Sequence, residues 1–392
     1  MPRQTHILTL VLCALLIFGC TSRPATNQFR IATFNAASGL PQAGELQRRL
    51  DSGNDEGLRA LAAILQAVRP DIVLLNEFDR LQGYDNAAVL LQNYLSVSQH
   101  GQRPIDYGWH WQGPVNTGVP SGLDLDGDGV RDGPADAWGF GRFPGQYAML
   151  VLSRFPIESD AVRTFRLMPW SQMPGVQAPR QVDGTPFYDP ETWRQLRLSS
   201  KTHADVPVLI NGRRIHVLVS HPTPPVFDGP EDRNGLRNYD EIRLWADYLD
   251  NQPFLIDDAG QRGGLEPQQP FVILGDLNAD PADGDSRPGA IAQLLQHPQV
   301  NSGCVPRSEG GLQASRTQGG INASQLGDPA SDTADFSDQH TGNLRIDYVL
   351  PSRDLNVGGC GVFWPPEGTL GSRWLNYSDH RLVWTDIRID DN

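Results

Sequence analysis

Short apolar runs, each followed by a turn-forming or polar residue, recur along this chain of 392 residues. Most have the length of a buried β-strand, and the clearest run is 271–274, which Gly275 ends. Similar patterns predict strands over residues 29–35, 71–77, 147–157, 199–203, 206–210, 214–220, 343–350 and 382–389. Helical spacing of apolar residues predicts helices over residues 58–68 and 237–249.

Polar side chains stand where several of these runs end. Asp276 and Asn278 follow the clearest run with a spacing of two, so an extended backbone would point both side chains to one side of the sheet. Asn35, Glu77 and His221 end three other runs. Because open α/β sheets place ligands at the carboxyl ends of their strands, these residues predict a common rim. The alternative for the first pair is an Asx-rich turn without chemistry, since Asp and Asn favour turns in any context.

Three stretches without clear periodicity interrupt the pattern, and we expect them to be insertions into one domain over residues 29–390. They lie around residues 112–146, 165–198 and 302–340 and are irregular, with many Gly, Pro, Asp or Ser residues. Long loops of this kind are often functional, so we expect the first and third to shape a substrate site and the second to be a surface excursion. Asn211-Gly212, by contrast, is a strong hairpin signal and predicts that the strands on either side pair with each other.

The first insertion contains a pattern typical of calcium loops. Carboxylates stand at positions 1, 3, 5 and 9, a glycine at position 6, and a backbone carbonyl is available at position 7. Position 12 is Ala135, so we expect the next residue to supply the last ligand. The predicted ligands are Asp124, Asp126, Asp128, Val130, Asp132 and Asp136. A structural Ca²⁺ is the interpretation we favour, and a solvated acidic loop is the alternative.

The N-terminus has the features of a secretion signal. Arg3 precedes the apolar stretch 7–18, which is too short to cross a bilayer as a helix. The residues up to Cys20 resemble a bacterial lipobox, so we expect 1–20 to be a lipoprotein signal peptide with Cys20 lipidated, and 21–28 to be a tether. This predicts export and anchoring in the outer membrane. Secretion without lipidation is the alternative.

Two cysteines, Cys304 and Cys360, remain in the mature chain beyond the signal and its lipidation site. In an oxidising compartment outside the cytoplasm they could form one disulfide bond. A pair of free buried thiols is the alternative, and it is less common outside the cytoplasm.

Charge, composition and missing motifs argue against several classes of function. The formal net charge is −14, and Lys201 is the only lysine. Proteins that bind duplex nucleic acid non-specifically need a positive stripe, and the chain has no basic run, so we expect no stable nucleic-acid complex. The chain also lacks a Gly-x-Ser-x-Gly elbow and a P-loop, which argues against a serine hydrolase and a P-loop nucleotide site.

The polar residues near strand ends form one chemical set. They are Asn35, Glu77, His221, Asp276, Asn278, Asp347, Asp379 and His380. Oxygen donors without cysteine suit Mg²⁺ or Mn²⁺ better than zinc. Hydrolysis of a phosphate ester needs a metal, a carboxylate that positions and deprotonates water, and His or amide donors for the developing charge. The set therefore predicts a metal-dependent phosphoester hydrolase.

The order of these motifs resembles that of the endonuclease/exonuclease/phosphatase superfamily. The similarity spans residues 29–389, and the Gly-Asp-x-Asn and terminal Ser-Asp-His motifs are its most specific parts. The matching segments are residues 31–35, 71–77, 152–157, 220–221, 275–278, 346–348 and 378–380. The resemblance implies an α/β fold of the deoxyribonuclease I type: a four-layer sandwich of two mixed β-sheets flanked by helices.

The resemblance also implies roles for individual residues. Glu77 is similar to the family's principal metal ligand, and Asn35 and Asp379 would contribute directly or through water. Asp276 resembles the residue that activates the attacking water, and Asn278 the residue that orients the water or the phosphate. The scissile phosphate would contact two histidines, His221 and His380, the second of them oriented by Asp347.

The substrate is less closely defined. An acidic, anchored enzyme with one lysine suits a small or soluble phosphoester, with a secreted metal-dependent nuclease as the alternative. From another class, a noncatalytic surface-binding lipoprotein that keeps the fold is a third hypothesis. We expect a monomer, bound to the membrane through its lipid. Four basic residues are candidates for extra phosphate contacts: Arg154, Lys201, Arg233 and Arg237.

Overall fold

A computed structural model describes residues 27–389, in which two mixed β-sheets pack face to face. Within this range the larger sheet has six strands in the order β12-β13-β1-β2-β4-β3, and the smaller has five in the order β11-β8-β7-β6-β5. The larger sheet contains β1 (Gln28–Ser38), β2 (Ile72–Phe78), β3 (Trp109–Trp111), β4 (Leu150–Ser153), β12 (Asn356–Phe363) and β13 (Leu382–Arg388). The smaller contains β5 (Arg163–Thr164), β6 (His203–Ile210), β7 (Arg213–Ser220), β8 (Phe271–Asp276) and β11 (Asp347–Pro351). A separate pair is formed by β9 (Ala334–Asp335) and β10 (Asn343–Leu344).

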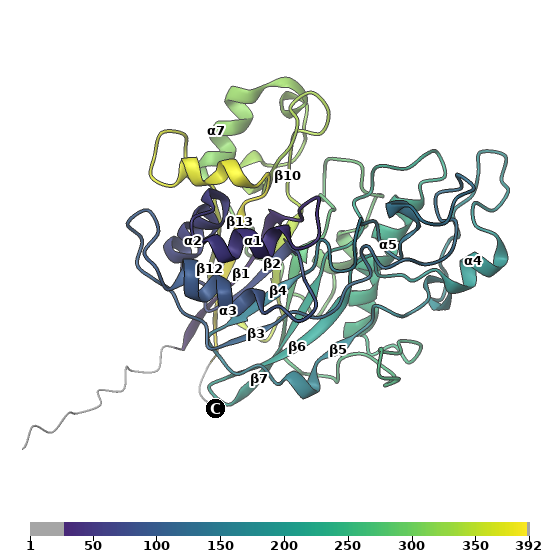
Figure 1. Cartoon of the computed structure of the whole chain (residues 1–392), viewed down its shortest axis with the longest axis horizontal. Helices are drawn as coiled ribbons and strands as arrows, with labels where there is room; N and C mark the ends of the chain where they lie inside the picture. Colours follow the sequence, from purple (N-terminus) through teal and green to yellow (C-terminus); the bar gives the residue numbers. More distant parts are fainter. Residues whose placement is uncertain (1–26, 390–392) are drawn as a thin grey trace, which may run out of the picture.

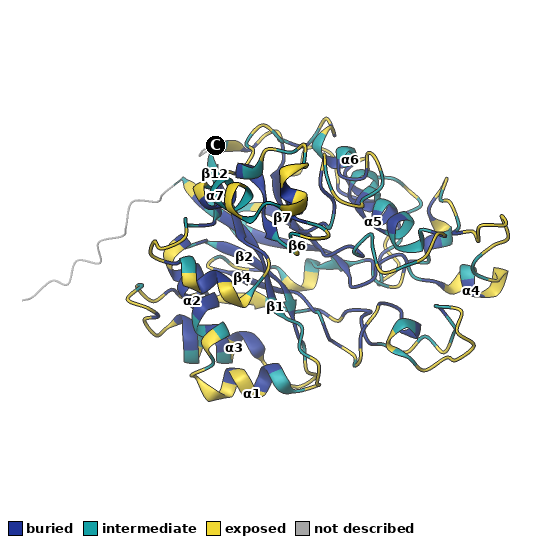
Figure 2. Ribbon diagram, turned by 90° about the horizontal axis from the view of Figure 1, so that it is seen from above, coloured by how far each residue is buried: buried dark blue, intermediate teal, exposed yellow. Residues whose placement is uncertain are grey.

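Helices cover the outer faces of the two sheets. In Figure 1, α1 (Glu45–Ser52), α2 (Glu56–Val68) and α3 (Asn86–Leu90) lie beside the larger sheet, and α5 (Arg233–Leu249) lies beside the smaller one. The central strands between them are mostly buried, as Figure 2 shows, whereas β3, β5 and β12 at the sheet edges are partly exposed. This arrangement confirms the fold expected from the sequence, with two mixed sheets and flanking helices.

Four further helices are short or peripheral. They are α4 (Pro190–Gln195), α6 (Ala292–Leu295), α7 (Glu309–Gln318) and the π-helical turn Leu91–Leu95. Short 3₁₀ segments occur at Pro134–Asp136, Ser159–Ala161, Trp170–Gln172, Gly320–Ala323, Pro329–Ser331 and Ser372–Tyr377. Most of them lie in the three stretches that the sequence marks as irregular.

The mixture of strand directions brings the functional strand ends together. The pairs β1–β2 and β7–β8 are parallel, whereas β8–β11 and β1–β13 are antiparallel. Parallel neighbours end at the same edge of a sheet, and an antiparallel neighbour begins there. The ends of β1, β2, β7 and β8 and the beginnings of β11 and β13 therefore meet at one side of the sandwich.

Both predicted helices and the predicted hairpin form. α2 begins after Asp55, whose carboxylate accepts a hydrogen bond from the backbone N–H of Leu58, and it ends just before Pro70. The hairpin joins β6 to β7 through Asn211 and Gly212, both of which have positive φ, as a type I′ turn requires.

The strand expected over residues 199–203 does not form as such, because β6 begins only at His203. The backbone groups of residues 200 and 201 instead form hydrogen bonds with a side chain of α5 and with a loop distant in sequence. Ser200 N–H donates to the Glu241 carboxylate, and the carbonyl of Lys201 accepts from the backbone N–H of Asn116. Tertiary contacts thus replace the sheet ladder at this point.

The third insertion is fastened to the larger sheet by a disulfide bond. Cys304 lies before α7, and Cys360 lies on the edge strand β12, and their sulfur atoms are bonded. The insertion also contains β9, which pairs with β10 just beyond its end.

The signal peptide, its Cys20 and most of the tether lie outside the described residues. Of residues 27–389, no helix has the length and apolar character needed to span a membrane.

Candidate active site

The strand ends bring together residues that are distant in sequence. Asp276 is the last residue of β8, and it pairs in register with Asp347, the first residue of β11. His221 follows β7, and His380 lies just before β13. All four are buried, with 1–5% of their surface exposed.

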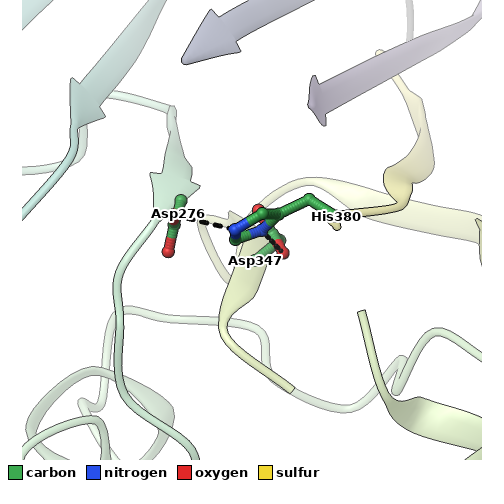
Figure 3. Close-up of side chains that lie close together, drawn as sticks. All are labelled: Asp276, Asp347 and His380. Carbon is green, nitrogen blue, oxygen red and sulfur yellow. Dashed lines mark hydrogen bonds and ion pairs between the residues drawn. The ribbon is translucent and has the colours of Figure 1, made fainter. Parts of the chain in front are cut away.

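One oxygen of Asp276 is the centre of this cluster. Its Oδ2 accepts a hydrogen bond from Asn35 Nδ2 at 3.1 Å. The same oxygen lies 3.3 Å from His221 Nε2 and 3.6 Å from His380 Nε2. Figure 3 shows the His380 ring between Asp276 and Asp347. Three nitrogen-bearing side chains thus converge on a single carboxylate oxygen.

His380 is fixed by a second carboxylate. Its Nδ1 lies 2.9 Å from Asp347 Oδ2, which also accepts a hydrogen bond from Thr333 Oγ1 at 2.8 Å. The ring of Phe336 packs edge-on against the imidazole at a centroid distance of 5.6 Å. Burial alone would lower the pKa of His380, but the charges of Asp347 and Asp276 and the hydrogen bond that His380 donates to Asp347 raise it to about 10. His380 is therefore an imidazolium at neutral pH.

His221, by contrast, is a neutral imidazole. Burial lowers its pKa well below the usual value, and the positive charges of Lys201 and His380 lower it further. Neutral His221 therefore lies 3.3 Å from Asp276 Oδ2 through its Nε2, and the two do not form an ion pair. Its Nδ1 is buried and has no hydrogen-bond partner among residues 27–389.

The carboxylates of the site are crowded. Burial raises the pKa of Asp276 to about 7, with His380 opposing and Asp347 adding to the shift. The pKa of Glu77 is also raised by burial, against the effect of the His380 charge and the Asn35 amide. Asp379 acts on Glu77 in the same direction as burial. Like charges held this close would be stabilised by a bound cation.

Asn278 forms an Asx turn and also lies at the site, so both interpretations of the Asp276–Asn278 pair hold. Its φ is +52°, so the backbone does not stay extended after Asp276, and its N–H donates to Asp276 Oδ1 at 3.0 Å. This is the Asx turn. Its side chain nevertheless remains at the site, where Nδ2 donates to the Pro222 carbonyl at 3.2 Å, next to His221.

The residues present fit a divalent metal of the magnesium type. Glu77 and Asn35 lie at the ends of β2 and β1, and Asp379 is half-exposed, with its Oδ1 4.0 Å from His380 Nε2. Asp276, Asp347 and His380 also offer ligand atoms within 4.8 Å of one another, although His380 would have to lose its proton before it could ligate. One oxygen of this second group, Asp347 Oδ1, is buried without a hydrogen-bond partner in the described chain. Carboxylate and amide oxygens are the ligands that Mg²⁺ prefers.

The structure brings only one of the four predicted phosphate-contacting cations to the site. Arg154 pairs with Asp71 at 2.9 Å, near the opposite end of β2. Arg233 is paired with Glu231, and Arg237 is half-buried and donates to the carbonyls of Leu198, Trp138 and Arg197. Lys201 is the exception, because the charges of Glu77 and Asp276 act on it and raise its pKa against the larger lowering by burial.

The predicted calcium ligands are only partly gathered. Asp124, Asp126 and Asp128 offer oxygens within 4.8 Å of one another. Asp136 instead accepts backbone N–H groups of Leu125 and Gly133, at 2.8 and 3.1 Å. Val130 and Asp132 are exposed. No further observation bears on this site, so the calcium remains a prediction from the sequence.

Sequence reasoning missed three polar residues that support the site. Thr333 comes from the third insertion and hydrogen-bonds Asp347. Asn238 and Glu241 lie on α5 and are completely buried, although the helical pattern of the sequence marks only the apolar residues of that helix. A run of Asn, Asp and Glu on the same turns as buried aromatic residues was the available signal.

Comparison with known proteins agrees with this geometry. The model of the Endonuclease/Exonuclease/phosphatase family matches residues 32–380. Among solved structures, an endonuclease/exonuclease/phosphatase from Beutenbergia cavernae has a TM-score of 0.52 and 19% identity, covering 92% of this chain and 72% of that chain. This likeness supports the fold.

Two other solved structures are more distant. A family protein from Leptotrichia buccalis has a TM-score of 0.48 and 14% identity, covering 93% of this chain and all of that chain. A Staphylococcus aureus beta toxin with bound magnesium ions has a TM-score of 0.46 and 13% identity, covering 91% and 99%. A search of curated proteins gave no match.

Proposed function

The chain belongs to the endonuclease/exonuclease/phosphatase family, and on that premise we propose that it is a divalent-metal-dependent hydrolase of small or soluble phosphoesters that acts outside the cytoplasm. The observation that carries the proposal is the convergence of Asn35, His221 and His380 on one oxygen of Asp276. A carboxylate oxygen that three side chains surround is positioned with little freedom, as a group that must orient one water molecule requires.

The chain's own side chains supply the proton-transfer and charge-stabilising groups. Asp276 positions the attacking water and accepts its proton. His380, held by Asp347 at 2.9 Å, donates through Nε2–H to the negative charge that develops on the phosphoryl oxygens. Asn278 and His221 orient the water and the phosphate from the opposite side. The division of duties among these residues follows the family resemblance and the hydrogen bonds of this site.

Glu77, Asn35 and Asp379 are the residues that we propose to hold the metal. Mg²⁺, or Mn²⁺ in its place, would neutralise the phosphoryl oxygens when bound. The repulsion of Glu77 with Asp276 and with Asp379 supports this assignment, since a bound cation would offset it.

The choice of substrate rests on charge. The formal net charge of −14 disfavours long duplex nucleic acid, which binds to positive stripes. A phosphate group on a small molecule needs only the local cations of the site. A secreted nuclease is the alternative that a substrate panel would reveal.

The location outside the cytoplasm is supported by the Cys304–Cys360 bond, because disulfides persist mainly in oxidising compartments. We propose that Cys20 carries the lipid and that the anchored protein is a monomer. Fractionation of cells that express Cys20→Ser tests the anchor, since this variant should move from the membrane to the soluble exported fraction. Retention in the membrane fraction would contradict lipidation at Cys20.

A panel of substrates tests the activity itself. The purified protein is assayed with Mg²⁺, Mn²⁺ and EDTA against nucleotides, inositol phosphates, phospholipids, and single- and double-stranded DNA and RNA. We expect metal-dependent release of phosphate or of a phosphomonoester from a small soluble compound, and reversible loss of activity with EDTA. Folded protein that is silent across the panel would favour the noncatalytic binding protein.

A further inference from the structure

Lys201 is an unusual residue in this protein. It is the only lysine among 32 Lys and Arg residues, and only 6% of its surface is exposed. Lysines are almost never buried to this degree without a partner, because removing an ammonium group from water is costly. An arginine-rich chain that keeps one buried lysine at one place implies a requirement for a compact point charge there.

The ammonium group of Lys201 lies at the active site. Its Nζ donates to the carbonyl of Pro222 at 3.3 Å, and Asn278 Nδ2 donates to the same oxygen at 3.2 Å. Pro222 directly follows His221. The charges of Glu241, Glu77 and Asp276 act on Lys201, and two of these carboxylates, Glu77 and Asp276, also interact with His380.

The ammonium group of Lys201 forms no ion pair with a carboxylate of the described residues. Within residues 27–389, no carboxylate oxygen lies within 4.0 Å of Nζ, and the bond to Pro222 is the single hydrogen bond of the ammonium group. An ammonium group has three donors. Two of them therefore have no protein acceptor and are available to an anion that enters the site.

Glu241 on α5 fixes the two segments that position this lysine. Its Oε1 accepts from Ser200 N–H at 2.7 Å and from Ser200 Oγ at 3.0 Å, and its Oε2 accepts from Thr223 N–H at 2.6 Å. Ser200 and Thr223 are the sequence neighbours of Lys201 and Pro222. Glu241 thus holds the Lys201–Pro222 contact in place without contacting the substrate.

We propose that Lys201 Nζ binds a non-bridging oxygen of the substrate's phosphate group, and that Glu241 is a positioning residue for this contact. The inference rests on the proposed function and adds a binding residue to it. Lys201, Asn278 and His221 would form one side of the phosphate site, opposite the Asp347–His380 pair. The ligand chemistry that this side recognises is a phosphate monoester or diester oxygen, with inorganic phosphate as the simplest form.

The single lysine allows a direct measurement. Protein labelled with ¹³Cε-lysine should give one Lys resonance from the folded chain, and inorganic phosphate is titrated into the magnesium-saturated protein. We expect the resonance to shift with the same saturation curve that calorimetry gives for phosphate binding. A resonance that stays in place while calorimetry shows saturation would overturn the proposal.

Variants provide an independent measurement. Lys201→Met should weaken phosphate binding roughly 10- to 100-fold, the usual effect of losing a charged hydrogen bond. The matched control is Arg316→Met, which removes one positive charge from an exposed position on α7 and should leave phosphate affinity unchanged. If Lys201 only stabilises the fold, Lys201→Met will lower the melting temperature but bind phosphate as the wild type does, and the proposal fails.

Glu241→Gln distinguishes positioning from general destabilisation. Gln keeps the volume and one acceptor but loses the charge, so we expect the ¹³Cε resonance of Lys201 to move in the free protein and KM for a phosphoester to rise more than kcat falls. An unchanged resonance and an unchanged KM would remove Glu241 from the proposal. Phosphate binding that depends on Lys201 in a wild type without turnover on any phosphoester would refute the proposed function and leave this binding site standing.

Discussion

At the scale of single residues, the two histidines of the site have pKa values shifted in opposite directions by their neighbours. His380 is paired with Asp347, and the carboxylate raises its pKa to about 10 despite burial. His221 has no carboxylate of its own beyond the shared Asp276, and burial keeps it neutral. Two buried imidazoles a few ångströms from one oxygen could not both be charged at low cost. The site therefore provides one fixed cation, His380, and one neutral imidazole, His221.

Replacement of Asp276 by Asn tests the residue on which the proposed function rests. The amide has the same shape, but it cannot accept a proton from water, so we expect kcat to fall roughly 10²- to 10⁴-fold. Circular dichroism and thermal unfolding should show a folded protein. The matched control is Asp285→Asn, an exposed residue of the loop after β8 that carries the same change in charge. Near-wild-type turnover in Asp276→Asn would show that Asp276 does not accept the proton of the attacking water.

At the scale of elements, α5 connects the core to the site. One face of the helix packs Ile242, Trp245 and Leu249 against the smaller sheet. On the same turns Asn238 Nδ2 donates to the carbonyls of Thr223 and Leu277, at 2.9 and 3.0 Å. A single rigid element thus orders the loops after β7 and β8, from which His221 and Asn278 extend.

Sequence reasoning found the strand ends because polar residues interrupt apolar runs there. This signal identifies four residues of the site: Asn35, Glu77, His221 and Asp276. Asp347 lies beside them because it pairs with Asp276 in the register of β8 and β11. The supporting contacts have no such signal. A buried Glu on a helix, or a Thr in a long irregular loop, is recognised only when the tertiary structure shows which backbone groups it satisfies. Edge strand β12 was missed because its Gly-Gly-Cys-Gly core lacks the β-branched pattern.

His203, at the start of β6, makes the junction with α5 sensitive to acid. Its Nδ1 contacts Ser199 Oγ at 2.7 Å, its Nε2 contacts the Glu241 carbonyl at 2.8 Å, and its ring packs against Trp245. Burial lowers its pKa to about 4, against the opposing effect of Glu241. Below its ordinary value of about 6.5 the unfolded chain binds a proton that the folded chain does not, so stability falls as pH drops from 6.5 toward 4.

We therefore expect His203 to make the protein about 2 kcal/mol less stable at pH 5 than at pH 7. The measurement is urea unfolding at both values for the wild type and for His203→Gln. Other groups titrate in both proteins, so the difference between the two pH dependences isolates this residue. Parallel dependences in the two proteins would show that His203 is protonated in the folded state.

The acidic loop of the first insertion gives a separate test of calcium binding. If a cation joins Asp124, Asp126 and Asp128, micromolar to millimolar Ca²⁺ should raise the melting temperature of a magnesium-saturated sample by a few degrees, since ligands of the folded state stabilise it. Asp126→Asn, which keeps the backbone hydrogen-bonding oxygen of this side chain, should remove most of the rise. A melting temperature that calcium leaves unchanged refutes the site.

At the scale of the whole molecule, the two sheets share one core, while long insertions surround the edge where the strands end. Residues of both sheets, such as Leu150 of β4 and Val217 of β7, belong to the same buried cluster. The third insertion contributes Thr333 to the site and is fastened to the edge strand β12 by the disulfide bond. The sheets thus provide a rigid frame, and the insertion adds both a polar contact and a covalent brace.

The disulfide bond between Cys304 and Cys360 closes a loop with a sequence separation of 56. Loop-closure entropy in the unfolded chain predicts a stabilisation of about 4 kcal/mol from a loop of this length. The Cys304→Ser/Cys360→Ser double variant should lose roughly that amount in urea unfolding, and a reducing agent should destabilise the wild type but not the variant. Since Thr333 lies in the braced segment and bonds Asp347, the variant should also lose part of its kcat before it unfolds. Wild-type stability in the double variant would show that packing around α7 and β12 holds the insertion without the covalent bond.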